Sequence, residues 1–336
     1  KGSFIKPGFL PLTVGPEEPS AKRFAWGSNV TGRLGDGTTT DYSSPIQVGT
    51  DTWTHLESMY NAGGGVKEAG TLWMWGNGGS GRLGLGNTTS YSSPVQVGAL
   101  TNWLNVSCGY STYAVKTDGS LWAWGYGGNG ELGQGNTTSY SSPVQVGALT
   151  NWLSTASSYQ FALAIKTDGT LWAMGKNTRG QLGDGTTTAR NSPVQIGSFT
   201  DWLSIACGQY TSFGVRSNGT MYSWGFSGTS QFAPNLGQSR SGPPNSSAPT
   251  QIGALTTWLA VSAGNYNMLA VKTDGTLWAW GAVGFGSATG ANSPVQVGSA
   301  TTWTNKISAG SGSTTSGSMM SGIQSDGTLW TWGFNN

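Results

Sequence analysis

The chain has 336 residues, of which only 9% are charged, and 16 basic against 14 acidic residues give a net charge of +2. The basic residues form no run and no stretch approaches about 18 apolar residues, which argues against a broad nucleic-acid footprint and a membrane span. Gly is abundant at 55 residues, but 36% hydrophobic and 11% aromatic residues exclude disorder and favour short aromatic strands joined by tight turns.

The chain opens with a segment, residues 1–21, that lacks the pattern of the rest. We expect it to act as a tether or to supply strands that close the first unit. Residues 3–6 and 11–15 are the candidate strands, because the second of them resembles the segment that ends each later unit. Residues 22–336 are predicted to form one domain.

A single repeat of about fifty residues runs through this domain. Its markers are a Trp-Gly pair, with Met-Gly in one copy, and a Pro that precedes a short apolar segment. The first marker lies at Trp26, Trp75, Trp124, Met174, Trp224, Trp280 and Trp332, and the second at Pro45, Pro94, Pro143, Pro193, Pro249 and Pro294.

Each copy is predicted to contain four short strands. In the clearest copy these are residues 103–107, 113–116, 121–124 and 143–147. The Asp118-Gly pair between the second and third strands is a two-residue hairpin signal of residues that tolerate positive φ. The Pro that opens the fourth strand belongs on an outer edge, since it cannot donate to a central ladder.

No segment has a helical period, so the fold class is all-β. Four antiparallel strands per copy predict the blades of a closed β-propeller, with a linear β-solenoid as the alternative. The Trp-Gly strand occurs seven times, but the segment between the first strand and the hairpin occurs six times. We therefore favour seven blades, with six as the alternative.

The Gly-rich loops carry a family resemblance. Residues 32–37, 81–86, 130–135 and 180–185 follow a Trp-Gly or Met-Gly pair and precede a Ser-Pro-Val-Gln-Val type of strand. This combination resembles the regulator of chromosome condensation repeat family and spans residues 22–336. The resemblance implies a seven-bladed propeller.

The sequence departs from that family at one position. Eukaryotic members usually carry a His shortly after the first strand, where this chain has Thr112, Phe161, Thr211 and Asn267; its one His is His55. The best-known member exchanges nucleotide on a small nuclear GTPase and contacts chromatin, but no matching acidic cluster, inserted wedge or basic tail is visible here. The regular, charge-poor copies look more like repeat proteins of bacteria and tailed bacteriophages, some of which decorate virions.

No residues assemble into a recognisable catalytic, cofactor or metal site. One His and two Cys cannot form a tetrahedral zinc site without carboxylates from distant copies. Cys108 and Cys207 occupy equivalent slots and are predicted to be inert core thiols rather than a disulfide. The Gly-rich loops lack the Lys-Ser/Thr ending of a phosphate-binding loop, and Asp36 and Asp184 suit turns better than a calcium site.

The 17 tryptophans all fall into three repeating slots. We therefore expect them to pack blade against blade. A sugar-binding lectin that uses Tyr91, Tyr140 and Tyr210 is the alternative use of aromatic residues.

Two insertions break the period, one between Trp224 and Pro249 and one over residues 311–320. Loops that break a repeat often carry function, although neutral drift also lengthens surface loops. The candidate partner-binding residues are Gln231, Phe232, Pro234, Arg240, Pro243, Pro244, Met319 and Met320.

Together these features predict a non-enzymatic scaffold or recognition propeller without cofactor. The leading hypothesis is a virion-surface protein, such as a phage capsid or tail accessory protein, or an extracellular attachment protein. Its partners would be virion proteins or a host surface receptor, with no nucleic acid and no membrane insertion. The alternatives are an intracellular partner-binding propeller, such as a GTPase regulator, and the lectin.

Overall fold

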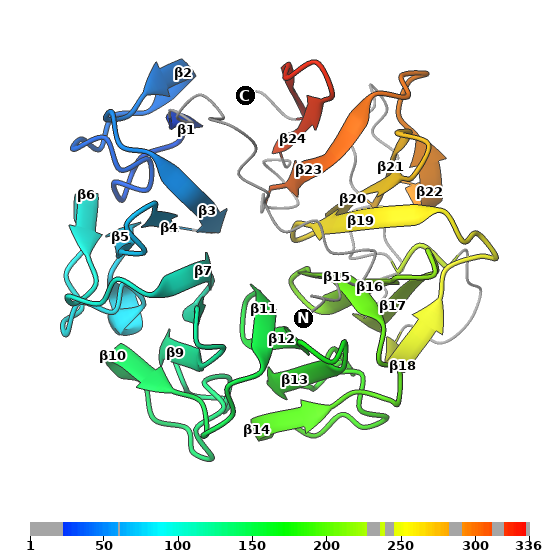
Figure 1. The fold of residues 1–336 in the computed structure, drawn as a ribbon, viewed down its shortest axis with the longest axis horizontal. Coiled ribbons are helices and arrows are strands. Elements are labelled where there is room, and N and C mark those ends of the chain that lie inside the picture. The colour runs from blue at the N-terminus through cyan, green and yellow to red at the C-terminus, as the bar shows by residue number, and fades with distance from the viewer. Residues whose placement is uncertain are drawn as a thin grey trace, which may run out of the picture.

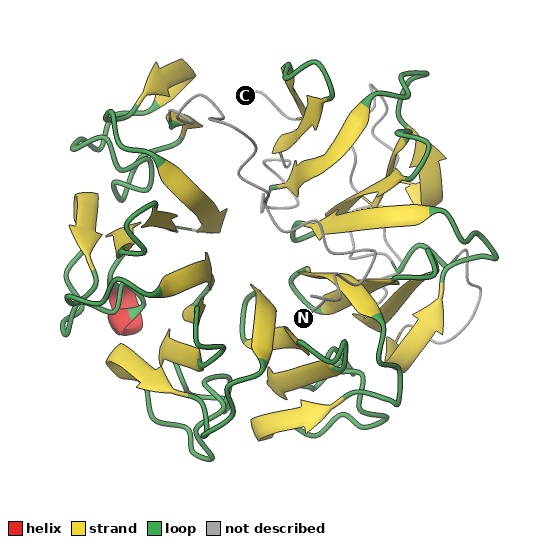
Figure 2. Cartoon of the chain, viewed as in Figure 1, coloured by secondary structure: helices red, strands yellow, loops and turns green. Residues whose placement is uncertain are grey.

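The computed structural model describes residues 23–59, 61–226, 236–238, 245–281, 291–310 and 319–333. These residues form antiparallel sheets arranged as a ring around a central axis, with the first strand of each sheet nearest the centre (Figure 1). Strands and loops make up nearly all of the described chain, and the helical exception is a 3-10 turn, η1 (Gly79–Gly81) (Figure 2). None of its helices could span a membrane.

Five of the sheets are complete four-stranded meanders, as the repeat predicts. In order along the chain they are β3 (Trp53–Met59), β4 (Ala62–Lys67), β5 (Leu72–Gly76) and β6 (Tyr91–Gln96); β7 (Trp103–Ser107), β8 (Ser111–Lys116), β9 (Leu121–Gly125) and β10 (Tyr140–Gln145); β11 (Trp152–Ser157), β12 (Phe161–Lys166), β13 (Leu171–Gly175) and β14 (Arg190–Gln195); β15 (Trp202–Cys207), β16 (Thr211–Arg216), β17 (Met221–Phe226) and β18 (Asn245–Gln251); and β19 (Trp258–Ala263), β20 (Asn267–Lys272), β21 (Leu277–Gly281) and β22 (Ala291–Gln296).

The two ends of the described chain form smaller sheets. A sixth sheet has three strands, β23 (Trp303–Ala309), β24 (Met319–Gln324) and β25 (Leu329–Gly333), and β1 (Phe24–Gly27) pairs with β2 (Tyr42–Gln47) alone. The all-β propeller is therefore confirmed, with six blades and an additional two-stranded sheet. Within the described residues the count is therefore six blades rather than the favoured seven, and the strands expected within residues 1–21 lie outside these residues.

The strand boundaries follow the predicted pattern closely but not completely. The first strand of the clearest copy is confirmed, whereas the fourth begins at Tyr140 rather than at Pro143. Pro143 lies inside this outer strand, where the register shifts between Tyr140 and Val144. Because of this shift, no backbone amide is needed at position 143 for the pairing with β9, and the outer strand can therefore contain Pro.

The hairpins between second and third strands differ from the predicted two-residue turn. The Gly119 amide donates to the Lys116 carbonyl at 2.9 Å, and the Lys116 amide donates to the Ser120 carbonyl at 3.0 Å. Gly119 has φ +78°, while Asp118 keeps a negative φ and accepts from the Ser120 amide. This is a three-residue loop with Gly in the left-handed position, so Asp118 serves as a side-chain acceptor rather than as a positive-φ residue.

The core lies between the blades, and five hydrophobic clusters each join two neighbouring sheets. Trp124 shows the arrangement, since it is fully buried and its indole N–H donates to the Arg82 carbonyl of the preceding sheet at 2.9 Å. The predicted packing role of tryptophan is confirmed for most positions, while Trp330 of the last sheet is 53% exposed. Cys108 and Cys207 are buried free thiols, as predicted.

Candidate functional site

The ring has two distinct faces. Because each sheet is an antiparallel meander, its first and third strands run the same way. The loops that follow these two strands leave from one face, which we call the loop face. The hairpins between second and third strands lie on the opposite face, which we call the hairpin face.

Both sequence insertions originate on the loop face, because one follows β17 and the other follows β23. The predicted residues Gln231, Phe232, Pro234, Arg240, Pro243 and Pro244 lie outside the described residues. Met320 at the start of β24 is only 1% exposed and belongs to the core cluster of the last two blades. Of the candidate residues that the structure describes, Met319 alone reaches solvent, at 42% exposure.

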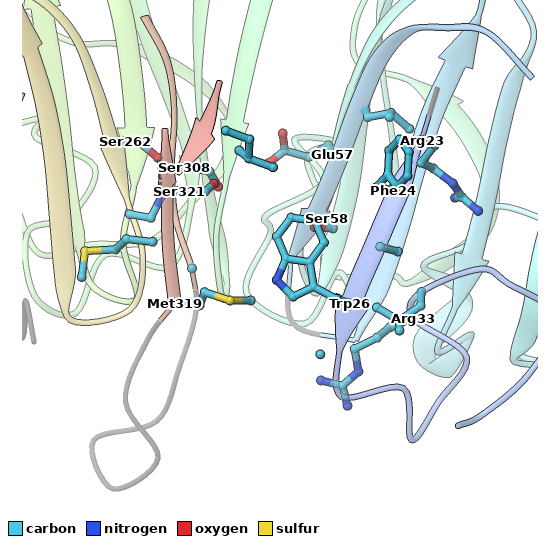
Figure 3. A pocket seen from close by; sticks show the side chains of 18 of the residues that line it. Arg23, Phe24, Trp26, Arg33, Glu57, Ser58, Ser262, Ser308, Met319 and Ser321 are labelled. Atoms are coloured by element: carbon cyan, nitrogen blue, oxygen red, sulfur yellow. Dashed lines mark hydrogen bonds between the residues drawn. The ribbon is translucent and has the colours of Figure 1, made fainter. Parts of the chain in front are cut away.

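Met319 borders a pocket of about 720 Å³ between β1 and the last blade. Trp26 and Met319 point toward one another across it, with Arg33 nearby and Glu57 further along the wall (Figure 3). Arg23, which also lines it, is committed to structure: its guanidinium stacks 4.4 Å from the Trp75 ring centroid and donates to the Gly35 carbonyl at 2.8 Å. Burial lowers the pKa of Arg23 to about 10.

A second cavity, of about 310 Å³, lies where the first strands surround the central axis. Its wall is held by polar contacts between blades, such as the 2.9 Å hydrogen bond between the Ser107 and Ser157 hydroxyls. His55 contacts the Val106 carbonyl through Nε2 at 2.8 Å, and burial lowers its pKa, so the ring is neutral and donates. Glu57 contributes a carboxyl group to the lining of this cavity, and burial raises its pKa to about 7.

These groups do not form a catalytic constellation. Burial raises the pKa of both the Cys108 and the Cys207 thiol, which disfavours the nucleophilic thiolate. Within the part of the chain that the structure describes, no cluster of three His, Cys, Asp or Glu side chains could hold a metal ion.

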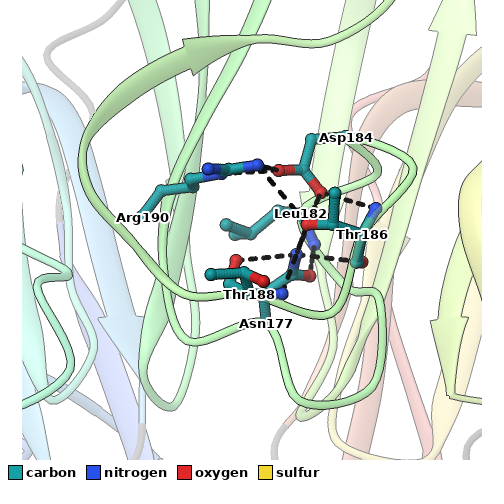
Figure 4. A network of polar contacts seen from close by, with 6 residues as sticks. All are labelled: Asn177, Leu182, Asp184, Thr186, Thr188 and Arg190. Carbon is teal, nitrogen blue, oxygen red and sulfur yellow. Dashed lines mark hydrogen bonds and ion pairs between the residues drawn. The ribbon is translucent and has the colours of Figure 1, made fainter.

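The Gly-rich loops use their polar side chains internally. Asp184 accepts from Asn177 Nδ2 at 3.0 Å and from Arg190 Nε at 2.6 Å (Figure 4). The Asn177 side-chain carbonyl accepts from the Leu182 amide at 3.0 Å, so the loop is cross-braced from within. Turn chemistry therefore accounts for Asp184 without a bound ion.

The sequence did not reveal an aromatic row near the central axis on the loop face. We call Tyr110, Tyr159, Tyr210 and Tyr266, each in the turn after a first strand, the tyrosine arc. Their ring centroids lie 4.5 Å apart for Tyr110 and Tyr159 and 6.4 Å apart for Tyr159 and Tyr210. All four rings are partly exposed, and burial together with the neighbouring Tyr210 raises the pKa of Tyr266, so the surface continues from three contacting rings to a fourth blade.

Of the three tyrosines considered for sugar binding, only Tyr210 belongs to this arc. Tyr91 and Tyr140 begin the outer strands β6 and β10, where each hydroxyl accepts from a loop asparagine. Tyr110, Tyr210 and Tyr266 share the slot immediately before the second strand, and Tyr159 lies one residue earlier because Gln160 holds that slot in its blade. The recurrence of Tyr in this slot was the signal that could have identified most of the arc.

Cations lie over the rings of this surface. Arg82 lies 4.7 Å from the Tyr110 centroid, Lys176 lies 5.9 Å from the Tyr210 centroid, and Arg179 lies 4.9 Å from the Phe226 centroid. The Lys176 ammonium also donates to Gln160 Oε1 at 2.7 Å. The arrangement is a preorganised aromatic and cationic surface with hydroxyl and amide groups between the rings.

Comparison with solved structures supports the architecture. Yeast RCC1 (Prp20) bound to Kap60 matches with a TM-score of 0.76 and 17% identity, over 92% of this chain and 78% of that chain. Human WBSCR16 matches with 0.78 and 15%, over 93% and 89%, and Prp20p from Saccharomyces cerevisiae with 0.76 and 19%, over 92% and 80%. At these identities the likeness concerns the fold. No curated protein matches the sequence.

Two family models describe the repeat itself. The regulator of chromosome condensation (RCC1) repeat matches residues 69–115, 118–165 and 168–215, and a second model of the same repeat matches residues 153–181, 202–231 and 258–286. Together these matches cover more than half of the chain. With its ring of repeated four-stranded blades, the chain belongs to the regulator of chromosome condensation repeat family.

Proposed function

We propose that this chain is a non-enzymatic recognition propeller that binds a protein partner on its loop face. The observation that carries the proposal is the tyrosine arc, in which equivalent turns of four blades place partly exposed rings in one row. Tyr and Arg are enriched at the energetic centres of protein interfaces, because they offer large contact area with few rotatable bonds. The stacked cations beside the arc fit the same role.

The absence of a catalytic set among the described residues supports the non-enzymatic part. His55 is bound to a backbone carbonyl, both thiols are buried, and no cluster of three His, Cys, Asp or Glu side chains occurs in this part of the chain. A protein scaffold needs none of these groups to be reactive.

The similar structures favour partner binding over attachment to a virion. One of them was solved with Kap60 bound, and the other yeast structure is described with binding to Gsp1p and histones. An intracellular partner-binding propeller, including a GTPase regulator, is therefore the better-supported form of the proposal. The virion-surface or extracellular placement rests on the style of the repeats alone.

Photo-crosslinking from each face tests the proposal. A photoreactive phenylalanine analogue is placed at Gln209 beside the arc or, as a control, at Leu149, a 49% exposed residue of the hairpin face. In source cells, we expect specific protein adducts from position 209 that excess wild-type chain removes by competition. The double variant Tyr159→Ala, Tyr210→Ala should fail to compete.

Other outcomes of the crosslinking experiment would contradict the proposal or select one of its alternatives. Adducts from position 149 alone would place the partner on the hairpin face and contradict the proposal. Binding to a glycan array without protein adducts would favour the lectin. A nucleotide-exchange assay on a captured GTPase would distinguish a regulator from a scaffold.

A further inference from the structure

We infer that the partner presents an acidic protein segment to the tyrosine arc. This inference rests on the proposed function and names the chemistry of the partner. It is carried by the separation of charge between the two faces of the ring and by the donors that surround the arc.

Positive charge at the arc is not balanced by exposed carboxylates of the described residues. Arg82 and Lys176 lie over rings of the arc, and Arg179 lies over the ring of Phe226, whose amide donates to the Tyr210 carbonyl at 2.9 Å. The nearby carboxyl, Glu131, is fully buried and accepts from the Asn129 amide, and burial raises its pKa. Arg179 is exposed and Lys176 is partly exposed, so these two residues present positive charge to a ligand, whereas Arg82 is buried against Tyr110 and the Glu131 carboxyl is turned into its loop.

The hairpin face has the opposite character. Its cations are occupied, as at Lys116, which lies 3.8 Å from the Trp122 ring centroid and is only 5% exposed. The carboxylates at the hairpins and at the connections between blades are Asp51, Glu68, Asp118, Asp168, Asp201, Asp274 and Asp326. Two of these carboxylates are ion-paired, Asp51 with Lys67 at 2.9 Å and Asp201 with Arg216 at 2.7 Å. The remaining carboxylates still leave the hairpin face more acidic than the arc, so an acidic ligand is attracted preferentially to the loop face.

The donors at the arc are preordered. Lys176 is anchored by its bond to Gln160, and the buried Arg82, which is fixed by a bond from Nε to the Gly79 carbonyl, supports the Tyr110 ring. Burial raises the pKa of Tyr159, so its hydroxyl stays protonated at neutral pH. Fixed donors next to aromatic rings bind carboxylates with little loss of side-chain freedom.

The ring geometry favours a peptide over an acidic polysaccharide. Neighbouring arc rings are inclined at 63° and 66°, so they present edges and hydroxyls in turn rather than one flat stacking platform. Edges and hydroxyls suit the alternating carbonyls and side chains of an extended peptide. Sugar rings stack best on faces that lie in one plane.

Fluorescence anisotropy with defined probes tests this inference. The probes are labelled decaglutamate, decalysine and an oligogalacturonate of similar length, each with the purified full chain. We expect decaglutamate to bind, with affinity that falls steeply as salt rises. In the double variant Lys176→Gln, Arg179→Gln its Kd should rise about tenfold, and the salt dependence should weaken.

Lys306→Gln is the matched control, because Lys306 is an exposed lysine on β23, away from the arc. It should leave the Kd unchanged, and a melting curve should show that all variants are folded. Equal binding of decaglutamate by wild type and double variant, no binding by wild type, or a preference for oligogalacturonate would overturn the inference. If photo-crosslinking still finds a partner at position 209, the proposed function survives and only the acidic chemistry fails.

Discussion

The ammonium of Lys166 lies 3.6 Å from the ring centroid of Trp172 and 4.7 Å from that of Trp152. Lys166 is only 5% exposed, and burial lowers its pKa. The same clamp of one lysine over two tryptophans recurs in four blades, at Lys67, Lys116, Lys166 and Lys272. In these four blades the lysine at the end of the second strand thus ties the first and third strands together.

Replacing Lys166 by Met tests the clamp, because Met keeps the apolar stem and removes the charge. A desolvated cation over aromatic rings contributes about 1–2 kcal/mol. We expect the free energy of unfolding, measured by urea denaturation, to fall by about 1 kcal/mol. Lys306→Met on the exposed face of β23 should change it little, and an equal loss in both variants would show that the clamp contributes nothing specific.

Gly84 and Gly98 form a matched pair for testing contact between blades. Both have positive φ, +71° and +61°, but a Cβ on Gly84 would lie 2.7 Å from the Trp124 indole nitrogen, while one on Gly98 would meet nothing within 4 Å. Gly98→Ala should lower the free energy of unfolding by about 1–2 kcal/mol, the strain of a left-handed backbone in a residue with a Cβ. Gly84→Ala should cost clearly more, because Trp124 must also move.

Thermal denaturation of the two glycine variants measures the difference directly. Near-ultraviolet circular dichroism should change for Gly84→Ala, since Trp124 is displaced, and not for Gly98→Ala. Equal melting temperatures would contradict the packing of the loop glycine against the tryptophan of the next blade.

Much of this architecture was predictable from the sequence because the repeat is local. The spacing of Trp103, Asp118 and Trp124 fixes three strands and their hairpin before any long-range contact is known. The turn type was missed because Asn-Gly and Asp-Gly pairs also occur in three-residue loops, where only Gly takes positive φ. The tyrosine arc was missed because it exists only once successive blades bring residues about fifty positions apart into contact.

Glu57 predicts how stability depends on pH. Burial raises its pKa from 4.5 to about 7 in the folded chain, so folding favours the protonated carboxyl. The folded state binds more protons than the unfolded state between these values, and stability therefore falls as pH rises from about 4.5 to about 7. Glu57→Gln should raise the melting temperature at pH 8 and leave it nearly unchanged at pH 4.5. A wild-type and variant difference that is independent of pH would rule out this titration.

Asn177 braces the Gly-rich loop in Figure 4, and its removal should loosen that loop. It is fully buried, accepts from the Leu182 amide and donates to the Thr186 and Thr188 carbonyls. Asn177→Ala leaves these backbone groups without their partner, at a cost of about 1–3 kcal/mol for each one that stays buried. Hydrogen exchange should accelerate over residues 178–188, whereas Thr178→Ala, an exposed change in the same loop, should have no effect.

Where Met174 replaces the Trp of the other blades, the indole hydrogen bond to the preceding blade is lost and another side chain makes it. Trp75 and Trp124 donate from the indole to a loop carbonyl of the preceding sheet, at Arg33 and Arg82. Met174 has no donor for the equivalent carbonyl of Glu131, and the Tyr113 hydroxyl donates to it at 2.7 Å instead.

Tyr113→Phe should therefore destabilise the chain by about 1–3 kcal/mol, because the buried Glu131 carbonyl loses its donor. Adding Met174→Trp to that variant should recover part of the loss, since an indole then reaches the same carbonyl. Met174→Trp alone should not stabilise, because the Tyr113 hydroxyl already occupies the acceptor. A double-mutant cycle of unfolding free energies measures the coupling, and strictly additive effects would show that Tyr113 and Met174 do not exchange this role.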